Sequence, residues 1–228
     1  MRRLSVLFSL MAALVVTGCS SQSEEVNVYS ARKEALIKPL LDRFTSETGI
    51  TVNLITGSAD ALVERMKAEG EHSPADVLIT TDAGRLYRAQ QEGQLATTES
   101  DTLTDQVPAA LRDPAGHWYG LSVRARVVVY APDRVDPSEL STYEALADQQ
   151  WDDRICIRSS DNIYNQSLTA SLIAHNGEAD TEQWAEGLVS NMARDPVGGD
   201  RDQIKALAAG ECDLAVVNTY YLGMMQGV

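Results

Sequence analysis

Three tyrosines of this chain could bind a metal ion together. Tyr220 and Tyr221 stand side by side after the apolar run 214–217, and Tyr164 lies in the polar, turn-like stretch 160–166. A deprotonated tyrosine presents a hard phenolate oxygen, which suits a small, highly charged cation such as ferric iron. The alternative is that the tyrosine rings pack at strand ends and the hydroxyls face water.

The other reactive residue types indicate a binding protein rather than an enzyme. The sequence has no nucleophile elbow, no phosphate-binding loop and no His-Glu metal motif. Its histidines, His72, His117 and His175, are isolated and lack the spacing of a zinc site. We therefore expect no catalytic activity.

Strand-like and helix-like segments alternate from residue 26 onward, which predicts an α/β fold. The first set is a βαβαβ unit with strands at 26–29, 50–55 and 77–80 and helices at 34–46 and 59–69. Gly49 is placed to end the first helix and Ser58 to cap the second. This order predicts a parallel sheet with a ligand crevice beyond its C-terminal strand ends.

A second set of elements follows the polar stretch 96–117. Its predicted strands and helices are a strand at 124–130, a helix near 143–148, a strand at 155–157, helices at 165–175, 181–192 and 203–209, and a strand at 214–217. We therefore expect a first lobe at 26–123, a crossover or hinge strand at 124–131, and a second lobe at 132–228.

The N-terminus has the layout of an export signal. Arg2 and Arg3 precede the apolar run 4–16, and a small residue, Gly18, precedes Cys19. This pattern predicts a signal peptide at 1–18 and resembles the lipobox of bacterial lipoproteins. Cys19 would then carry the lipid and 19–25 would be a polar tether on the extracytoplasmic face of the membrane. An uncleaved anchor is the alternative.

The net charge indicates which partners are disfavoured, and the cysteine count indicates whether a disulfide forms. The formal net charge of −14 argues against a nucleic-acid partner, although acidity also serves solubility. After Cys19 the chain has two cysteines, Cys156 and Cys212. In an exported protein an even count favours a disulfide, and the alternative is two independent buried thiols.

Five separated blocks of the sequence resemble one known family. The blocks are 26–38 (VNVYSARKEALIK), 73–88 (SPADVLITTDAGRLYR), 119–128 (YGLSVRARVV), 158–168 (RSSDNIYNQSL) and 218–223 (NTYYLG). Together they look like the periplasmic ferric-ion-binding proteins of bacterial ABC iron importers. The resemblance implies a two-lobed periplasmic-binding-protein fold of type 2, which closes like a Venus flytrap. It also implies delivery of Fe(3+) to an inner-membrane permease and its ATPase, and we expect a monomer.

The resemblance also implies roles for individual residues. The paired tyrosines and the tyrosine before Asn-Gln-Ser supply phenolate ligands in that family, which matches Tyr220, Tyr221 and Tyr164 here. Some relatives have a histidine after the first strand, where this chain has Arg32-Lys33-Glu34. A synergistic anion such as carbonate would complete the iron shell, and the anion-binding candidates are Arg32, Arg124 and Ser30. Structural ion pairs are the alternative role for both arginines.

Two further expectations remain from the sequence. The same architecture could instead bind an oxyanion or a small organic solute, with the tyrosines merely lining the cleft. The C-terminal end of the sequence gives a separate expectation. Members of the resembled family continue well beyond the tyrosine pair, whereas this chain has seven residues after Tyr221. We therefore expect the C-terminal part of the fold to be missing.

Overall fold

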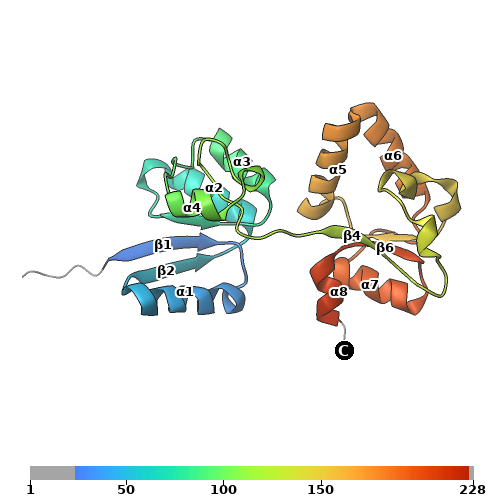
Figure 1. Cartoon of the computed structure of the whole chain (residues 1–228), viewed down its shortest axis with the longest axis horizontal. Helices are drawn as coiled ribbons and strands as arrows, with labels where there is room; N and C mark the ends of the chain where they lie inside the picture. The colour runs from blue at the N-terminus through green and yellow to red at the C-terminus, as the bar shows by residue number, and fades with distance from the viewer. Residues whose placement is uncertain (1–23, 226–228) are drawn as a thin grey trace, which may run out of the picture. The chain divides into compact units, whose positions relative to one another are not determined.

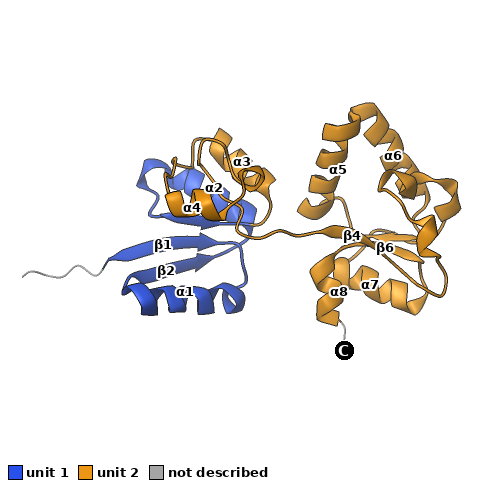
Figure 2. Cartoon of the chain, viewed as in Figure 1, with its two compact units in different colours: residues 1–80 blue, residues 81–228 orange. Residues whose placement is uncertain are grey.

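The computed structural model describes residues 24–225, and the chain divides into two compact units (Figure 2). Unit 1 comprises residues 1–80 and unit 2 residues 81–228. The lobe and hinge boundaries expected from the sequence stay a prediction. The predicted signal peptide and Cys19 lie outside the described residues.

Unit 1 contains a three-stranded parallel sheet formed by the predicted βαβαβ unit. Its strands are β1 (Glu25–Ser30), β2 (Thr51–Thr56) and β3 (Val77–Ile79), in the order β2-β1-β3. The connecting helices are α1 (Glu34–Thr48) and α2 (Ala59–Glu69), and Figure 1 shows them on opposite sides of the sheet. The winding direction therefore reverses at the central strand, which is the topology that forms a ligand crevice beyond the C-terminal strand ends.

One residue ends α1, and another residue caps the start of α2. Gly49 adopts a left-handed conformation with φ 77°, and its N–H donates to the carbonyl oxygen of Thr45. The Ser58 side chain accepts a hydrogen bond from the backbone N–H of Ala61 at the start of α2. Both predicted helix boundaries are confirmed, and α1 extends two residues beyond the predicted end at residue 46.

Tyr29 closes the small core of unit 1. Its ring is fully buried with Leu62 and Met66. Its hydroxyl donates to both oxygens of Glu69, at 2.9 and 3.0 Å, and Arg65 lies over the ring. Burial and the bond to Glu69 raise the pKa of this hydroxyl. Tyr29 is therefore a core residue.

Unit 2 begins with two short helices that the sequence pattern did not predict. They are α3 (Ala83–Gln91) and α4 (Asp101–Gln106). Ala89 is the one buried residue of α3, and no residue of α4 is buried. Their start signals are side-chain caps, because Asp82 accepts from Gly84 N and Ser100 accepts from Leu103 N.

Short 3₁₀ helices connect several elements. They are η1 (Gly70–His72), η2 (Ala109–Leu111), η3 (Pro137–Glu139), η4 (Glu144–Ala147) and η5 (Gln149–Trp151). The helix predicted near 143–148 is therefore present as a single 3₁₀ segment.

A mixed three-stranded sheet forms the centre of unit 2. Its strands are β4 (Arg126–Tyr130), β5 (Ile155–Ile157) and β6 (Leu214–Asn218), in the order β4-β6-β5. β6 runs antiparallel to β4 and parallel to β5, and every residue of β6 is buried. The helices that cover the sheet are α5 (Ile163–Asn176), α6 (Glu178–Ser190), α7 (Asp200–Ala209) and α8 (Thr219–Met225). Figure 1 shows α5 and α6 on one side and α7 and α8 on the other.

Alternating residues of β6 divide the core of unit 2 into two clusters. Leu214 and Val216 pack with the first cluster, which contains Trp151 and Trp184. Ala215 and Val217 pack with the second cluster, whose members from α7 include Ile204. Because successive side chains of a strand point to opposite faces, one central strand supplies both layers.

A disulfide ties the second cluster together. Cys156 of β5 is bonded to Cys212, which precedes β6, across 56 positions of sequence. Both side chains are buried. The disulfide is confirmed, and the alternative of two free thiols is wrong.

Candidate metal centre

Each of the three tyrosines lies at the beginning of a helix. Tyr164 is in the first turn of α5, where the Asn162 side chain accepts a hydrogen bond from its backbone N–H at 3.0 Å. Tyr220 and Tyr221 lie in α8, which starts directly after β6. The predicted turn is present only at the start of the stretch 160–166, at residues 160–161, because α5 begins at Ile163, two residues before the predicted helix start at 165.

The fold brings the tyrosine hydroxyls of unit 2 together. The hydroxyl oxygens of Tyr164 and Tyr220 are 3.3 Å apart, and either can donate to the other. The rings of Tyr220 and Tyr221 lie 4.3 Å apart between centroids, tilted by 39°. All three side chains are half-buried. The arrangement presents phenolic oxygens from two elements to one region.

The three phenols affect one another's ionisation. Burial raises the pKa of Tyr164 and that of Tyr221, and hydrogen bonding to Tyr220 raises both further. Burial acts in the same direction on Tyr220, but hydrogen bonds from Tyr164, Tyr221 and Asn218 outweigh it and lower its pKa. The hydrogen bonds among the three phenols therefore favour an anion on Tyr220 over one on Tyr164 or Tyr221, and a cation bound beside them would favour the phenolate form of each.

Three arginines surround Tyr164. The guanidinium carbons of Arg158, Arg124 and Arg126 lie 5.5, 5.7 and 5.9 Å from the centroid of its ring. Arg124 also lies 6.0 Å from the ring of Tyr220. These distances are typical of cation–π contacts. The positive charge favours a phenolate or a bound anion at this place.

The described part of the chain offers no conventional metal cluster elsewhere. Across residues 24–225, no group of three or more His, Cys, Asp or Glu side chains could hold a metal ion. The phenol oxygens of the three tyrosines are therefore the candidate metal ligands. Among the helices of the same range, none has the length and apolar character that a membrane crossing requires.

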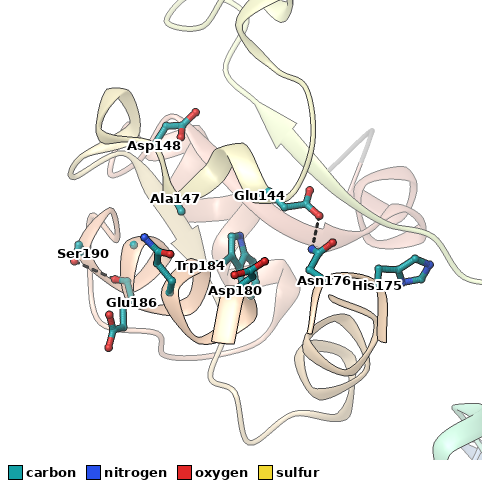
Figure 3. Close-up of a pocket in the computed structure, with 11 residues that line it drawn as sticks. Glu144, Ala147, Asp148, His175, Asn176, Asp180, Trp184, Glu186 and Ser190 are labelled. Carbon is teal, nitrogen blue, oxygen red and sulfur yellow. Dashed lines mark hydrogen bonds between the residues drawn. The ribbon is translucent and has the colours of Figure 1, made fainter. Parts of the chain in front are cut away.

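A polar hollow lies elsewhere in unit 2 (Figure 3). It has a volume of about 830 Å³ and is lined by η4, the end of α5 and α6. Glu144, Asp180 and Glu186 give it an acidic lining, and Asn176 donates to Glu144 at 2.9 Å. No tyrosine lines it, so it is separate from the phenol cluster.

A family model described as "Bacterial extracellular solute-binding protein" matches residues 72–228. The chain belongs to this family. The match includes all three tyrosines and the three arginines around Tyr164.

Curated relatives of this solute-binding protein are named for iron. It is 52% identical over 204 residues to "Iron uptake protein A1" of Synechocystis, covering 90% of this chain and 57% of the relative. It is 47% identical over 222 residues to "Iron uptake protein A2" of the same organism, covering 97% of this chain and 63% of the relative. The resemblance to ferric-ion-binding proteins is thus confirmed.

Solved structures of similar proteins support the α/β fold. A Trichodesmium protein "in complex with iron and citrate ligands" is 52% identical with a TM-score of 0.84, over 90% of this chain and 65% of that one. Apo FutA2 from Synechocystis is 49% identical with a TM-score of 0.84, over 91% and 64%. The periplasmic-binding-protein fold is confirmed. The chain spans less than two thirds of the length of these relatives.

The predicted anion-binding residues belong to different units. Arg124 lies in unit 2 against the tyrosines, as described above. Ser30 and Arg32 belong to unit 1, where the buried hydroxyl oxygen of Ser30 accepts from the backbone N–H of Arg32 at 3.2 Å. The Arg32 side chain is exposed. The anion-binding role of all three residues stays a prediction, and so does lipidation of Cys19.

The sequence pattern did not indicate four residues that hold the surroundings of the tyrosines. Three of them contact or adjoin the phenol cluster: Arg126, Arg158 and Asn218. The fourth is Asp200, which joins the other three by ion pairs and hydrogen bonds. A charged residue at the end of an otherwise apolar strand, as at Arg126 and Arg158, is the local signal that could have indicated them. Asp200 gave no such signal, because an acid at a helix start is ordinary.

Proposed function

We propose that this solute-binding protein captures ferric iron with the phenolate oxygens of Tyr164, Tyr220 and Tyr221. The supporting observation is the 3.3 Å separation of the Tyr164 and Tyr220 hydroxyl oxygens, with the tilted ring of Tyr221 beside that of Tyr220. Phenolates are hard donors that suit Fe(3+), and three of them balance its charge. The iron in the Trichodesmium relative and the names of the Synechocystis relatives agree with this cargo.

A synergistic anion completes the iron shell in this proposal. Three phenolates leave positions of an octahedral shell open, and carbonate or a similar anion can fill them. Arg124 is suited to hold it, since its guanidinium lies close to both Tyr164 and Tyr220. Arg32 and Ser30 of unit 1 are the further candidates, with the exposed Arg32 side chain available for an anion.

The working context follows from the same proposal. The protein is a monomeric lipoprotein, anchored through Cys19 on the extracytoplasmic face of the membrane. It passes iron to an ABC permease and its ATPase, and it performs no catalysis. The names of two relatives, an iron uptake protein and an Fe(3+)-binding periplasmic protein, support the iron cargo and the periplasmic location within this proposal.

An oxyanion receptor is the second candidate function. The observation in its favour is the set of three guanidinium groups around Tyr164, which would suit an anion without any metal. In that case the tyrosines would only line the site.

Calorimetry with purified protein separates the two functions. We expect strong heat of binding with ferric citrate and none comparable with citrate, phosphate or sulfate alone. The double variant Tyr220→Phe and Tyr221→Phe should lose more than about 100-fold in ferric affinity, beyond the range for partners outside the metal shell. Tyr87→Phe is the matched control, because Tyr87 is exposed on α3. Binding of phosphate without iron, or an unchanged double variant, would overturn the proposal.

A further inference from the structure

Asp200 is a buried carboxylate that joins three elements of unit 2. Its residue is 1% exposed. It accepts hydrogen bonds from Arg126 Nη1 at 3.1 Å, from Arg158 Nη1 at 3.2 Å and from the backbone N–H of Asn218 at 2.8 Å. A buried charge is tolerated only when it is paired and hydrogen-bonded, and this one is.

The chain places Asp200 by a turn that requires glycine. Gly198 has φ +76°, and a Cβ there would come within 2.6 Å of an Asp202 carboxylate oxygen. The same carboxylate accepts from the backbone N–H of Gly199 at 2.7 Å, which fixes the start of α7. Asp200 is then the first residue of α7, where the helix dipole also favours a negative charge.

The Asp200 carboxylate connects both to the arginines beside the Tyr164 ring and to the end of the strand that precedes Tyr220. Arg126 and Arg158, which it holds, are the guanidinium groups at 5.9 and 5.5 Å from the Tyr164 ring. Asn218, whose backbone it also holds, is the last residue of β6 and directly precedes α8. The Asn218 side chain accepts from Arg126 Nη1 at 3.1 Å, and its amide nitrogen lies 3.5 Å from the Tyr220 hydroxyl.

A second carboxylate with the same chemistry stands at the opposite end of β6. Asp213 accepts from Arg134 Nε and from Arg154 Nε, each at 2.7 Å, and directly precedes the strand. Neither of these arginines has a tyrosine among its cation–π partners; Arg154 lies over Trp151. Each end of β6 is thus anchored by a carboxylate that bridges two arginines, but only the bridge at Asp200 reaches the phenols.

Asp200 contributes to the orientation of both arginines, although Arg126 also donates to the carbonyl oxygen of Val216 and to Asn218 Oδ1, each at 3.1 Å. The Nε atoms of Arg126 and Arg158 are buried and have no hydrogen-bond partner among the described residues. Asp200 is the carboxylate that pairs with both guanidinium groups. Without its charge, the two guanidinium groups would lose their shared partner and their mutual repulsion would be uncompensated, which should loosen their placement beside the Tyr164 ring.

We propose that Asp200 is a positioning residue for ferric binding, which rests on the function proposed above. It holds the strand end that carries Tyr220 in place relative to Tyr164, and it fixes the two guanidinium groups against the Tyr164 ring. Its negative charge also offsets the positive charge that three arginines place around a trivalent cargo. Asp213 anchors the strand without any role in binding.

Three variants test this assignment: Asp200→Asn, Asp200→Glu and, as matched control, Asp213→Asn. Each purified protein is titrated with ferric citrate, the visible absorbance is recorded, and thermal unfolding is measured. We expect both Asn variants to unfold at lower temperature. Asp200→Asn should also lose about 10- to 100-fold in ferric affinity, as for partners outside a metal shell, and shift the absorption band. Asp213→Asn should keep the wild-type affinity and band.

Asp200→Glu decides the case if Asp200→Asn fails to fold. It retains the charge but moves it by one methylene, so we expect partial recovery of affinity with a band that is still shifted. A wild-type band and affinity in either folded Asp200 variant would overturn the assignment, as would an equal effect of Asp213→Asn. If the unaltered protein itself gives no band with ferric citrate, the proposed function fails and this inference with it.

Discussion

The hydroxyl oxygens of Tyr164 and Tyr220 lie 3.3 Å apart, although 56 positions separate the residues in sequence. The first is held by the capped start of α5 and the second by the helix that follows β6. Two independent elements of one unit therefore present phenols to each other. This relationship is the basis of the proposed iron site.

Ferric affinity should fall as the pH falls. Each phenol that binds iron must release its proton, so protons compete with the metal. The loss should approach about tenfold per pH unit for each proton displaced. Titrations with a competing chelator between about pH 8 and pH 6 measure this slope after correction for the protonation of the chelator and of the anion. An affinity independent of pH would contradict phenolate ligation.

The ion pairs of Asp213 with Arg134 and Arg154 should make the free energy of unfolding depend on pH in the acidic range. Burial alone would raise the pKa of Asp213, but bonds from Arg154 and Arg134 outweigh it and lower the pKa. A carboxyl group whose folded pKa is depressed contributes stability above its unfolded pKa, about 3.9, and loses it as the pH falls through the folded pKa. The urea unfolding free energies of the wild type and Asp213→Asn should therefore differ most above about pH 5, and the difference should shrink as the pH falls below about 4 and passes the folded pKa. A constant difference would count against this role.

Reduction of the Cys156–Cys212 disulfide should destabilise unit 2. The bond closes a loop across 56 positions, for which the chain-entropy model gives about 4 kcal/mol. Urea unfolding with and without reductant measures the effect. The double variant Cys156→Ala and Cys212→Ala serves as control and should not respond to reductant. If the reductant leaves the wild-type midpoint unchanged, the bond contributes nothing.

Substitution of Gly187 should disturb the packing of α6 on η4. A Cβ at Gly187 would lie 2.7 Å from the Cβ of Ala147 and 3.0 Å from its carbonyl oxygen. Gly187→Ala should therefore cost about 1–3 kcal/mol of unfolding free energy, as overpacking does. Gly223→Ala in α8 is the matched control, because a Cβ there meets nothing within 4 Å. Equal effects of the two variants on thermal unfolding would show that the close contact is relieved without cost.

Much of the fold could be predicted because apolar periodicity marks it. The strand at 155–157 and the helix at 59–69 have their predicted bounds, and the Ser58 cap and the Gly49 stop are confirmed. The missed helices α3, α4 and α8 are short. Their lengths of nine, six and seven residues leave too few turns for a repeat of apolar positions to be recognised.

The surroundings of the site could not be predicted from local sequence. Asp200 pairs with Arg126 and Arg158 across 74 and 42 positions, and no local pattern encodes such a contact. The tyrosine pair was visible in the sequence, but its proximity to Tyr164 depends on where β6 ends and where α5 begins. Local signals predict elements, whereas the site arises from where several elements terminate together.

The visible spectrum of the iron-loaded protein tests the central claim most directly. Ferric citrate added to the purified wild-type protein should give a phenolate-to-iron charge-transfer band, with tyrosinate modes in the resonance Raman spectrum excited within it. The double variant Tyr220→Phe and Tyr221→Phe should lose both. A colourless ferric complex, or a band that persists in the double variant, would contradict iron binding by these phenols.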